Sequence, residues 1–326
     1  MAGGPTLKLN SGHEIPQIGL GTWLSKPNEV AKAVESALKD GYRHIDGATI
    51  YQNENEVGAG WKASGVPREE IFLTTKNWNN ARTKEGVKKQ LDQSLKELQT
   101  DYVDLLLIHW PVVFKTGEEL FPHNADGTVA LGEVPVEETW EAFEELVKEG
   151  KVKSIGVSNF TEERIEKLLK TAKIPPAVNQ IEYHPYLQQP GLAKYLASKN
   201  IVLEAYSPLG NNTYGFPRAI DDERVIDLAK KKGKDAAALI VNWIRSKNHV
   251  VLPKSVTPSR IKSNFEVFDL SPEEIKFLDS LDEESRRNDP IEWGVDIFGT
   301  ATPEEIKKRV DEAAKKYLAE QKKSKL

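Results

Sequence analysis

The chain lacks cysteine altogether and has a single methionine in its 326 residues. The absence of cysteine excludes disulfides, thiolate nucleophiles, cysteine-ligated zinc and iron–sulfur clusters. A basic excess is missing too, because 45 Lys and Arg residues are mixed along the chain with 50 Asp and Glu residues. A nucleic-acid partner is therefore not expected. Any chemistry of this protein must use oxygen and nitrogen side chains.

Long apolar runs are also absent. The longest, such as 105–108, are far too short to cross a bilayer, and the first residues lack the apolar core of a secretory signal. These features predict a cytoplasmic globular protein that does not bind membranes, and the charge balance is compatible with a monomer. The last three residues, Ser324, Lys325 and Leu326, match a peroxisomal address that a eukaryotic host would read. The alternative is a lysine-rich tail that ends this way by chance.

Short apolar runs alternate with longer segments of helical periodicity through most of the chain. Eight runs are expected to be strands: 18–21, 42–46, 71–76, 102–109, 152–157, 177–181, 201–206 and 250–252. Seven charge-faced segments between them are expected to be helices: 28–39, 55–64, 84–98, 136–149, 162–170, 190–198 and 235–246. Repeated strand–helix units without a break in composition predict an α/β fold, a (β/α)8 TIM barrel.

Two additions frame the expected barrel. Residues 6–17 predict a hairpin that turns at 10–12. Near the other end, Thr302 is followed by a proline and two glutamates, a combination typical of a helix start, and an amphipathic pattern continues from there. We therefore expect one domain over 1–300 and a C-terminal helix and tail over 301–326.

Polar residues follow or end most of the expected strands. In parallel barrels the functional site lies at the carboxyl ends of the strands. The residues concerned are Asp46, Lys76, His109, Asn159, Gln180, Tyr206 and Lys254. Each alone is explained by capping, core hydrogen bonding or solvent exposure, but seven at successive strand ends predict one shared site. The stretches 112–135 and 211–222 are long for connecting loops, and such loops are usually functional.

A phenol lies close to these residues, since Tyr51 follows Asp46 by five positions. Its ordinary pKa of about 10 requires a neighbouring cation to lower it before the phenol can donate a proton near neutral pH. Lys76 is the natural cation, Asp46 would hold its ammonium, and His109 would hydrogen-bond a carbonyl oxygen. The set predicts proton donation to a developing alkoxide, which needs a hydride donor as its partner.

A basic segment is the candidate site for that partner. Residues 254–260 place two cations and several hydroxyls at an expected strand end and the first turn of a helix. This arrangement suits phosphate groups. A basic helix start that binds nothing is the alternative interpretation.

Two other motifs are set aside. The segment 58–63 spells the dinucleotide-binding fingerprint, but it lies inside an expected helix and not after a strand, so it predicts a packing face of small residues. His44 and Asp46 resemble the first-strand ligands of metal-dependent barrel hydrolases, yet the remaining histidines form no second spaced pair. No metal is expected.

The motifs together resemble the aldo-keto reductases, over nearly the whole chain from Thr6 to about Thr300. The resemblance rests on separated motifs in the same order: Gly19-Leu-Gly-Thr-Trp23, 46–54, Thr75-Lys76, Ile108-His109-Trp110-Pro111, Gly156-Val-Ser-Asn159-Phe, Asn179-Gln180, Ala205-Tyr206-Ser-Pro-Leu209 and 252–258. It implies reversible NADPH-dependent reduction of an aldehyde or ketone, with oxidation of a polyol or glycerol in the reverse direction. Asp46, Tyr51, Lys76 and His109 would form the catalytic tetrad, with Tyr51 as the general acid.

The resemblance also implies how NADP(H) is bound. Tyr206 would stack on the nicotinamide, and Ser158, Asn159 and Gln180 would hold its carboxamide. Gly21 and Thr22 are further implied cofactor contacts, and Ser207 and Leu209 would contact the pyrophosphate. The 2′-phosphate would be bound by Lys254, Ser255, Thr257 and Arg260, and Asn264 would lie near the adenine. Ser263 departs from the family, since many members carry an acidic adenine contact there.

Within the family, the segments 114–122 and 293–299 are most similar to the fungal glycerol dehydrogenase and glyceraldehyde reductase group, with xylose reductases as near neighbours. Aromatic residues near strand ends and in these segments are expected to wall the substrate pocket, ordinary core packing being the alternative for the tryptophans. They are Trp23, Trp78, Trp110, Phe114 and Trp293.

Three other interpretations stay open. The first is a cofactor-binding regulatory subunit with little catalysis, like the potassium-channel β subunits of this fold family. The second is a metal-dependent barrel hydrolase, which predicts activity that a chelator removes. The third concerns origin, because the regular Glu and Lys usage after Thr302 is also typical of an engineered or idealised sequence.

Overall fold

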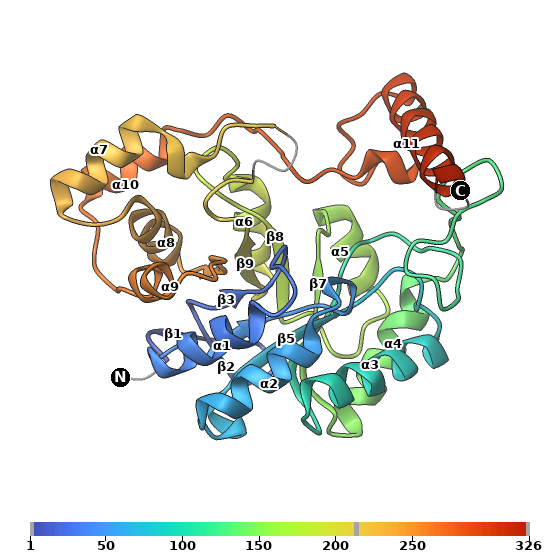
Figure 1. The fold of residues 1–326 in the computed structure, drawn as a ribbon, viewed down its shortest axis with the longest axis horizontal. Coiled ribbons are helices and arrows are strands. Elements are labelled where there is room, and N and C mark those ends of the chain that lie inside the picture. Colours follow the sequence, from blue (N-terminus) through green and yellow to red (C-terminus); the bar gives the residue numbers. More distant parts are fainter. Residues whose placement is uncertain (1–2, 212–214, 324–326) are drawn as a thin grey trace.

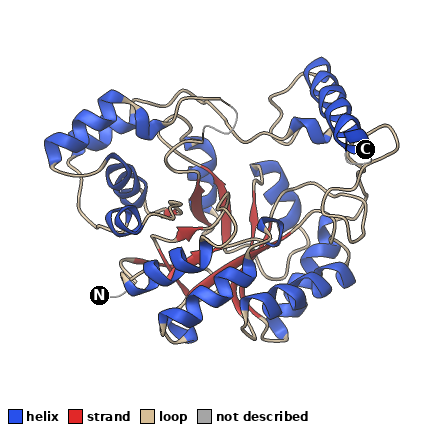
Figure 2. Ribbon diagram, in the orientation of Figure 1, coloured by secondary structure: helices blue, strands red, loops and turns tan. Residues whose placement is uncertain are grey.

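The computed structural model describes residues 3–211 and 215–323, in which a ring of parallel strands is surrounded by helices (Figure 1, Figure 2). The strands are β3 (Leu20–Gly21), β4 (His44–Asp46), β5 (Phe72–Asn77), β6 (Val103–Ile108), β7 (Val152–Ser158), β8 (Val178–Glu182), β9 (Val202–Tyr206) and β10 (Val250–Val251). Each strand pairs with the next along the chain. Parallel bridges from Ile18 to Val251 and from Gly21 to Lys254 join the last strand to the first. The predicted barrel is confirmed, with one strand in each of the eight expected runs.

Helices cover the outside of the ring. Seven of them match the expected segments: α1 (Val30–Lys39), α2 (Glu54–Ser64), α3 (Lys84–Leu98), α4 (Val136–Lys148), α5 (Glu162–Leu169), α6 (Pro190–Ser198) and α8 (Ala236–Ser246). The helix α9 (Pro258–Asn264) begins in the basic segment as expected, whereas α7 (Glu223–Lys232) and α10 (Pro272–Asp279) are additional. Short 3-10 turns complete the set: η1 (Thr49–Tyr51), η2 (Arg68–Glu70), η3 (Ala219–Asp221) and η4 (Ile291–Trp293).

The helix α3 shows why these segments fold as they do. Its buried residues Val87, Leu91, Leu95 and Leu98 recur at intervals of three or four, which places them on one face against the barrel. Thr83 starts the helix, because its Oγ1 accepts the Gly86 amide at 3.1 Å. Most of the remaining positions are polar and at least partly exposed, whereas Ser94 is buried and donates to Glu54 Oε2 at 2.8 Å.

The fingerprint-like segment in α2 is a packing face, as predicted. A side chain at Gly58 would place its Cβ 2.4 Å from the carbonyl oxygen of Glu97, and one at Gly60 would lie 2.5 Å from that of Ala31. Both distances are far below van der Waals contact. The glycines therefore allow α2 to lie directly against α1 and α3.

The expected N-terminal hairpin closes one end of the barrel. Its strands β1 (Thr6–Lys8) and β2 (Glu14–Pro16) pair antiparallel. Leu9 and Ile15 are buried in one apolar cluster with barrel residues that include Leu105 and Val178. The site described below therefore lies at the other end, where the strands finish.

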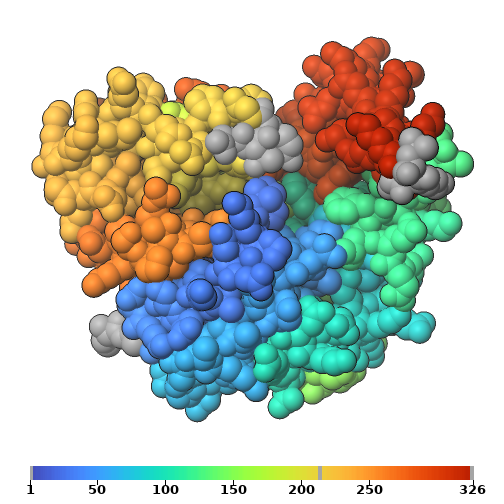
Figure 3. Space-filling model, viewed as in Figure 1, coloured from blue at the N-terminus to red at the C-terminus, as the bar shows by residue number. Residues whose placement is uncertain are grey.

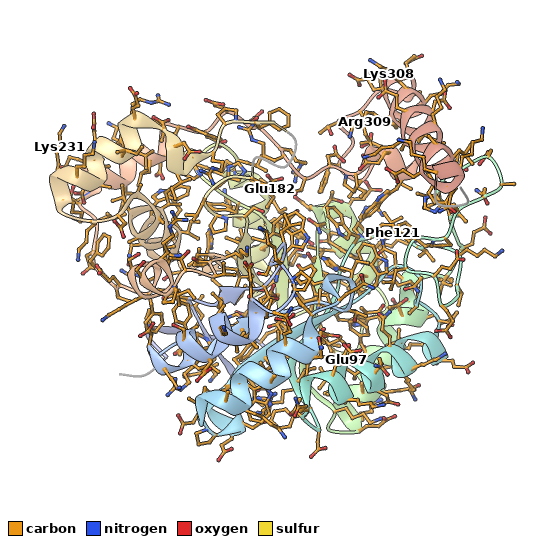
Figure 4. The ribbon with its side chains drawn as sticks, viewed as in Figure 1. Glu97, Phe121, Glu182, Lys231, Lys308 and Arg309 are labelled. Carbon is orange, nitrogen blue, oxygen red and sulfur yellow. The ribbon has the colours of Figure 1, made fainter. Side chains whose placement is uncertain are left out.

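A last helix stands beside the barrel. The helix α11 (Pro303–Lys323) starts at Thr302 through the predicted cap, since the Glu305 amide donates to Thr302 Oγ1 at 3.2 Å. It forms a lobe against the 112–135 loop (Figure 3), where His123 stacks on Tyr317 with ring centroids 3.7 Å apart. Figure 4 shows Arg309 on this helix, and its guanidinium lies 3.1 Å from Glu292.

No helix within residues 3–211 and 215–323 combines the length and the apolar character needed to cross a bilayer. The tripeptide Ser324, Lys325 and Leu326, which matched an import address, lies outside the described residues.

Candidate active site

The four residues predicted to act together lie where β4, β5 and β6 finish. Asp46 is the last residue of β4, Lys76 is the penultimate residue of β5, and His109 directly follows β6. Tyr51 ends the short turn η1, which starts three residues after Asp46. Because parallel strands end on the same side of a barrel, the fold brings these side chains to one site.

Lys76 and Asp46 form a buried ion pair. The Lys76 Nζ lies 2.6 Å from Asp46 Oδ1 and 2.8 Å from Oδ2, and it also donates to the Gly47 carbonyl at 2.8 Å. The lysine is fully buried. Burial opposes the ammonium, but the charge of Asp46 and its hydrogen bond to Lys76 act the other way, and the pKa of Lys76 is raised above its ordinary value. The site thus keeps a fixed positive charge.

Tyr51 lies beside this charge. Its ring centroid is 5.2 Å from Lys76 Nζ and 5.7 Å from the centroid of the His109 ring. Burial raises the pKa of Tyr51 to about 12, although Lys76 acts to lower it. The expectation that the lysine would bring the pKa of Tyr51 below its ordinary value is therefore wrong, since burial outweighs the cation. The phenol is protonated at neutral pH.

His109 contacts both Tyr51 and the aromatic residues around the site. Its ring meets that of Trp78 edge-on, with centroids 5.2 Å apart, and its Nδ1 is buried without a hydrogen-bond partner. Burial, followed by the charges of Lys76 and Arg82, lowers the pKa of His109 well below 6.5. The imidazole is therefore neutral and can act as a hydrogen-bond donor.

The residues expected around a nicotinamide lie next to the tetrad. Asn159 has a left-handed backbone, with φ of 62°, and its Nδ2 donates to the His109 carbonyl at 3.0 Å. The Tyr206 hydroxyl donates to Asn159 Oδ1 at 2.7 Å. Ser158 Oγ donates to the main-chain carbonyl of Gln180 at 2.8 Å. The side-chain Nε2 of Gln180 donates to Asp46 Oδ2 at 2.9 Å. The structure therefore brings these residues into one hydrogen-bonded group with the tetrad.

The predicted phosphate residues lie further along the same end of the barrel. Gly21 pairs with Lys254, whose Nζ donates to the Leu24 carbonyl at 3.1 Å. Ser255 Oγ accepts the Thr257 amide at 3.1 Å, and Arg260 is exposed on α9. One cation thus lies at the bridge to Gly21 and the other on α9.

Other predicted cofactor residues occupy the edge between these two groups. Thr22 Oγ1 donates to the Asp46 carbonyl at 2.8 Å. Ser207 has a left-handed backbone, with φ of 49°, and leads through Leu209 into the next turn. Asn264, at the end of α9, has a buried Oδ1 without a hydrogen-bond partner. An orphaned buried acceptor of this kind suits an amino group of a bound ligand.

Aromatic side chains form a wall beside the tetrad. The wall consists of Trp78, Trp110, Phe114 and Trp293. Trp293 meets each of the other three rings edge-on, Trp78 meets Phe114 in the same way, and the ring centroids of these pairs lie 5.2 to 5.9 Å apart. Trp78 and Phe114 are almost entirely buried and support the wall, whereas Trp110 and Trp293 are partly exposed. Trp23 is partly exposed and shares no ring contact with the described residues of the cluster.

Several residues of the site were not predicted from the sequence. Phe121 joins the aromatic wall, 5.3 Å from Trp78 between ring centroids, and Figure 4 shows it on the α11 side of the molecule. Glu182 accepts the backbone amides of Arg287 and Asn288 at 2.9 to 3.1 Å, which ties the segment leading to Trp293 to the barrel. Their signals were weak, because Phe121 lies in a long loop and Glu182 ends an apolar run.

The histidine that prompted the metal interpretation has a structural role. His44 Nδ1 donates to the Pro16 carbonyl at 3.1 Å. In the described part of the chain, no three His, Asp or Glu side chains come together in a way that would hold a metal ion.

Comparisons with known proteins agree with the geometry. A model of the Aldo/keto reductase family matches residues 17–283. The chain is 45% identical over 318 residues to a D/L-glyceraldehyde reductase of Hypocrea jecorina, covering 92% of this chain and 96% of that protein. It is 46% identical over 286 residues to an uncharacterized oxidoreductase of Schizosaccharomyces pombe, covering 86% and 89%.

A solved structure shows the same fold. The aldose reductase of Schistosoma japonicum superposes with a TM-score of 0.85 at 39% sequence identity, covering 91% of this chain and all of that one. Since the family match spans most of the barrel and the relatives are similar along nearly their whole length, the chain belongs to the aldo/keto reductase family.

Proposed function

We propose that the protein reduces an aldehyde or ketone to the alcohol with NADPH, and that Tyr51 is the general acid. The observation that carries the proposal is the partly buried Tyr51 phenol beside the Lys76–Asp46 ion pair at the carboxyl end of the barrel. A protonated phenol next to a fixed ammonium is suited to donate a proton, because the ammonium stabilises the phenolate that remains.

The residues near the tetrad fit a nicotinamide cofactor. The nicotinamide end would be held by Gln180, Asn159 and Tyr206. Lys254 and Arg260 would bind the 2′-phosphate, and the unpaired Asn264 Oδ1 would accept a hydrogen bond from the adenine. Gly21, Thr22, Ser158, Ser207, Leu209, Ser255 and Thr257 would complete the cofactor contacts. The cofactor supplies a hydride to the carbonyl carbon when it is bound.

The chain's own residues manage the carbonyl oxygen. Neutral His109 donates a hydrogen bond that orients the oxygen toward Tyr51. Tyr51 gives its proton to the oxygen as negative charge develops there, which leaves a tyrosinate facing Lys76. Asp46 keeps the ammonium in place throughout. In the reverse direction the tyrosinate takes the proton from the alcohol.

The substrate we propose is a small carbonyl compound related to glyceraldehyde, with its polyol as the product. The similarity to the glyceraldehyde reductase of Hypocrea jecorina supports this class. Trp110 and Trp293, the partly exposed members of the aromatic wall, would contact the carbon chain, with Trp23 as a further pocket residue and with Trp78 and Phe114 behind them.

A substrate panel tests the reaction class. Purified protein is mixed with NADPH or NADH and with short aldehydes, ketones and their alcohols, while the absorbance of the reduced cofactor is followed. We expect loss of NADPH only when a carbonyl compound is present, and gain of NADPH from NADP and a polyol. Binding of NADPH without turnover of any carbonyl compound would contradict the proposal and favour a regulatory subunit.

Cofactor choice is tested at α9. We expect Arg260→Ala to weaken NADPH binding by about tenfold or more while NADH binding changes little, because a charged hydrogen bond to the 2′-phosphate is lost. Lys262→Ala is the matched control, since it removes a second exposed cation from the same helix. Cofactor fluorescence titrations measure both. Equal weakening of NADPH and NADH would contradict the assignment.

A further inference from the structure

A buried carboxyl group that the proposed reaction does not use lies behind the tetrad. Glu204, in β9, is fully buried inside the barrel. Its Oε2 accepts a hydrogen bond from Gln180 Nε2 at 2.7 Å, and its Oε1 lies 3.4 Å from His44 Nε2. A buried carboxyl group with only these neighbours requires an explanation, because burying an acid without a cation of its own is costly.

Gln180 connects this group to the tetrad. Its Nε2 donates one hydrogen to Asp46 Oδ2 at 2.9 Å and the other to Glu204 Oε2 at 2.7 Å. The Asp46 carboxylate is paired with Lys76 and can only accept hydrogen bonds, so its contact with Nε2 fixes which way the glutamine amide is turned. Its carbonyl oxygen must therefore face away from both carboxyl groups.

The hydrogen bonds around His44 indicate which form of Glu204 is present. His44 Nδ1 donates to the Pro16 carbonyl, so Nε2 of the neutral ring is an acceptor. Burial lowers the pKa of His44 to about 4, which keeps the ring neutral. The groups that face this acceptor are Thr74 Oγ1 at 3.3 Å and Glu204 Oε1 at 3.4 Å. A protonated Glu204 has a hydrogen to offer there, and an ionised one has none.

The charges around Glu204 favour the same form. From β4 it faces Asp46 and neutral His44, from β5 it faces Lys76, and Tyr51 also lies within its electrostatic reach. The residue paired with it on β10 is Val250, which carries no charge. Lys76 is already neutralised by Asp46. Burial and the charge of Asp46 raise the pKa of Glu204 to about 8.

We propose that Glu204 is a positioning residue. As a neutral acid it accepts one hydrogen of the Gln180 side-chain amide, which leaves the second hydrogen directed at Asp46 and keeps Asp46 against Lys76. This inference rests on the proposed function, because it assigns Glu204 a part in keeping the ammonium beside Tyr51 and in presenting the Gln180 carbonyl to the nicotinamide end of the site. Glu204 itself touches neither substrate nor cofactor.

The first test needs no activity. Urea unfolding of wild type and Glu204→Gln is compared without cofactor from pH 5 to pH 8. An acid whose pKa is raised in the folded state stabilises the protein fully below its unfolded pKa of 4.5, and this stabilisation is lost as the pH rises toward 8. The glutamine variant does not titrate. Its urea midpoint should therefore move upward relative to wild type as the pH rises, whereas a constant offset or a falling one would overturn the neutral-acid form.

The second test concerns positioning. Glu204→Leu removes the partner of Gln180, so kcat should fall about tenfold or more, NADPH should bind more weakly, and KM for the carbonyl should change little. Glu204→Gln should restore much of the loss, because its amide can accept from Gln180 and donate to His44. Glu54→Gln is the matched control, since Glu54 is equally buried but is bonded to Thr75 and Ser94 instead of Gln180. Wild-type kcat and NADPH affinity in a folded Glu204→Leu protein would overturn the proposal.

The outcomes separate the two claims. If wild type reduces no carbonyl compound, the proposed function fails, and the urea comparison still decides whether Glu204 is a neutral acid. If wild type is active but Glu204→Leu, Glu204→Gln and Glu54→Gln all have the same kcat and NADPH affinity, only the proposed role of Glu204 fails. If the leucine variant does not fold, the pH dependence of the glutamine variant decides.

Discussion

Tyr51 and His109 have perturbed pKa values that define their chemical roles. Burial keeps the phenol protonated, with a pKa of about 12, and keeps the imidazole neutral by lowering its pKa well below 6.5. In the direction of reduction, the acid and the orienting donor are therefore both in their working forms across the neutral range.

These protonation states predict that kcat depends on pH differently in the two directions of the reaction. We expect kcat for carbonyl reduction to be nearly constant from about pH 6 to 7, because neither His109 nor Tyr51 titrates there and Glu204, with a pKa of about 8, is still protonated. Alcohol oxidation needs tyrosinate as the base, so its kcat should rise with pH over the same range. The measurement is kcat against pH with saturating substrates. A reduction profile that falls below about pH 6.5 would show that His109 titrates at its ordinary value.

At the scale of single residues, the sequence predicted most of the polar residues that interrupt apolar runs, although not Glu182, and it missed Glu204, which lies within a run. Asp46, Lys76 and His109 are polar residues at strand ends, where a barrel places its site. Glu204 is an ionisable residue as well, but it lies inside an apolar run, and only the alternation of a strand places it on the side of Asp46 and His44. The pKa of Tyr51 was misjudged because burial cannot be read from the spacing of residues.

The strands and most helices were predictable because their apolar periods are clear. The helix α7 was missed because only Val225 and Ala229 are buried, in a segment otherwise dominated by charges. The helix α10 has eight residues and a single buried one, Leu278, although its capping box was present in the sequence. Short helices with narrow apolar faces give little periodicity to detect.

Close approach between helices gives a prediction at this scale. Gly58→Ala should lower the free energy of unfolding by about 1–3 kcal/mol, because its Cβ would overlap the Glu97 carbonyl. Gly191→Ala is the control, since this helical glycine has no atom within 4 Å of an added Cβ, and alanine should raise stability by up to about 1 kcal/mol. Urea unfolding measures both. Equal effects of the two substitutions would refute the close contact.

At the scale of the whole molecule, the barrel and α11 differ in how they are held. Among the described residues, which end at 323, none beyond Phe298 belongs to the apolar clusters of the barrel. The helix α11 instead packs on the 112–135 loop, where a side chain at Gly127 would lie 2.8 Å from the Ala314 carbonyl. We propose that residues 1–300 form the catalytic domain and that 301–326 are an attachment that steadies this loop.

Truncation tests that division. A chain ending at residue 300 should keep its secondary structure and unfold thermally within a few degrees of the full chain, because the barrel core is intact. Its 112–135 loop should be cut faster by proteases, since His123 loses the stacking of Tyr317. Thermal unfolding and limited proteolysis measure the two effects. A truncated chain that fails to fold would contradict the domain assignment, and unchanged proteolysis would contradict the role of α11.

The barrel and its strand ends could be predicted because apolar runs alternate with segments of helical periodicity along the chain. The packing of α11 could not be predicted in this way. Its cap and amphipathic pattern predicted a helix, but contact between Tyr317 and His123 joins segments far apart in the sequence, and no local pattern encodes such a contact. The aromatic wall combines loop and C-terminal residues for the same reason.

The central claim is that Tyr51 donates the proton, and Tyr51→Phe tests it most directly. The variant keeps the ring and its packing but has no hydroxyl, so kcat for carbonyl reduction should fall by about 10²- to 10⁴-fold. The dissociation constant of NADPH, measured by fluorescence titration, should stay close to that of wild type. A variant that binds NADPH and reduces carbonyl compounds at a near-normal rate would contradict the account.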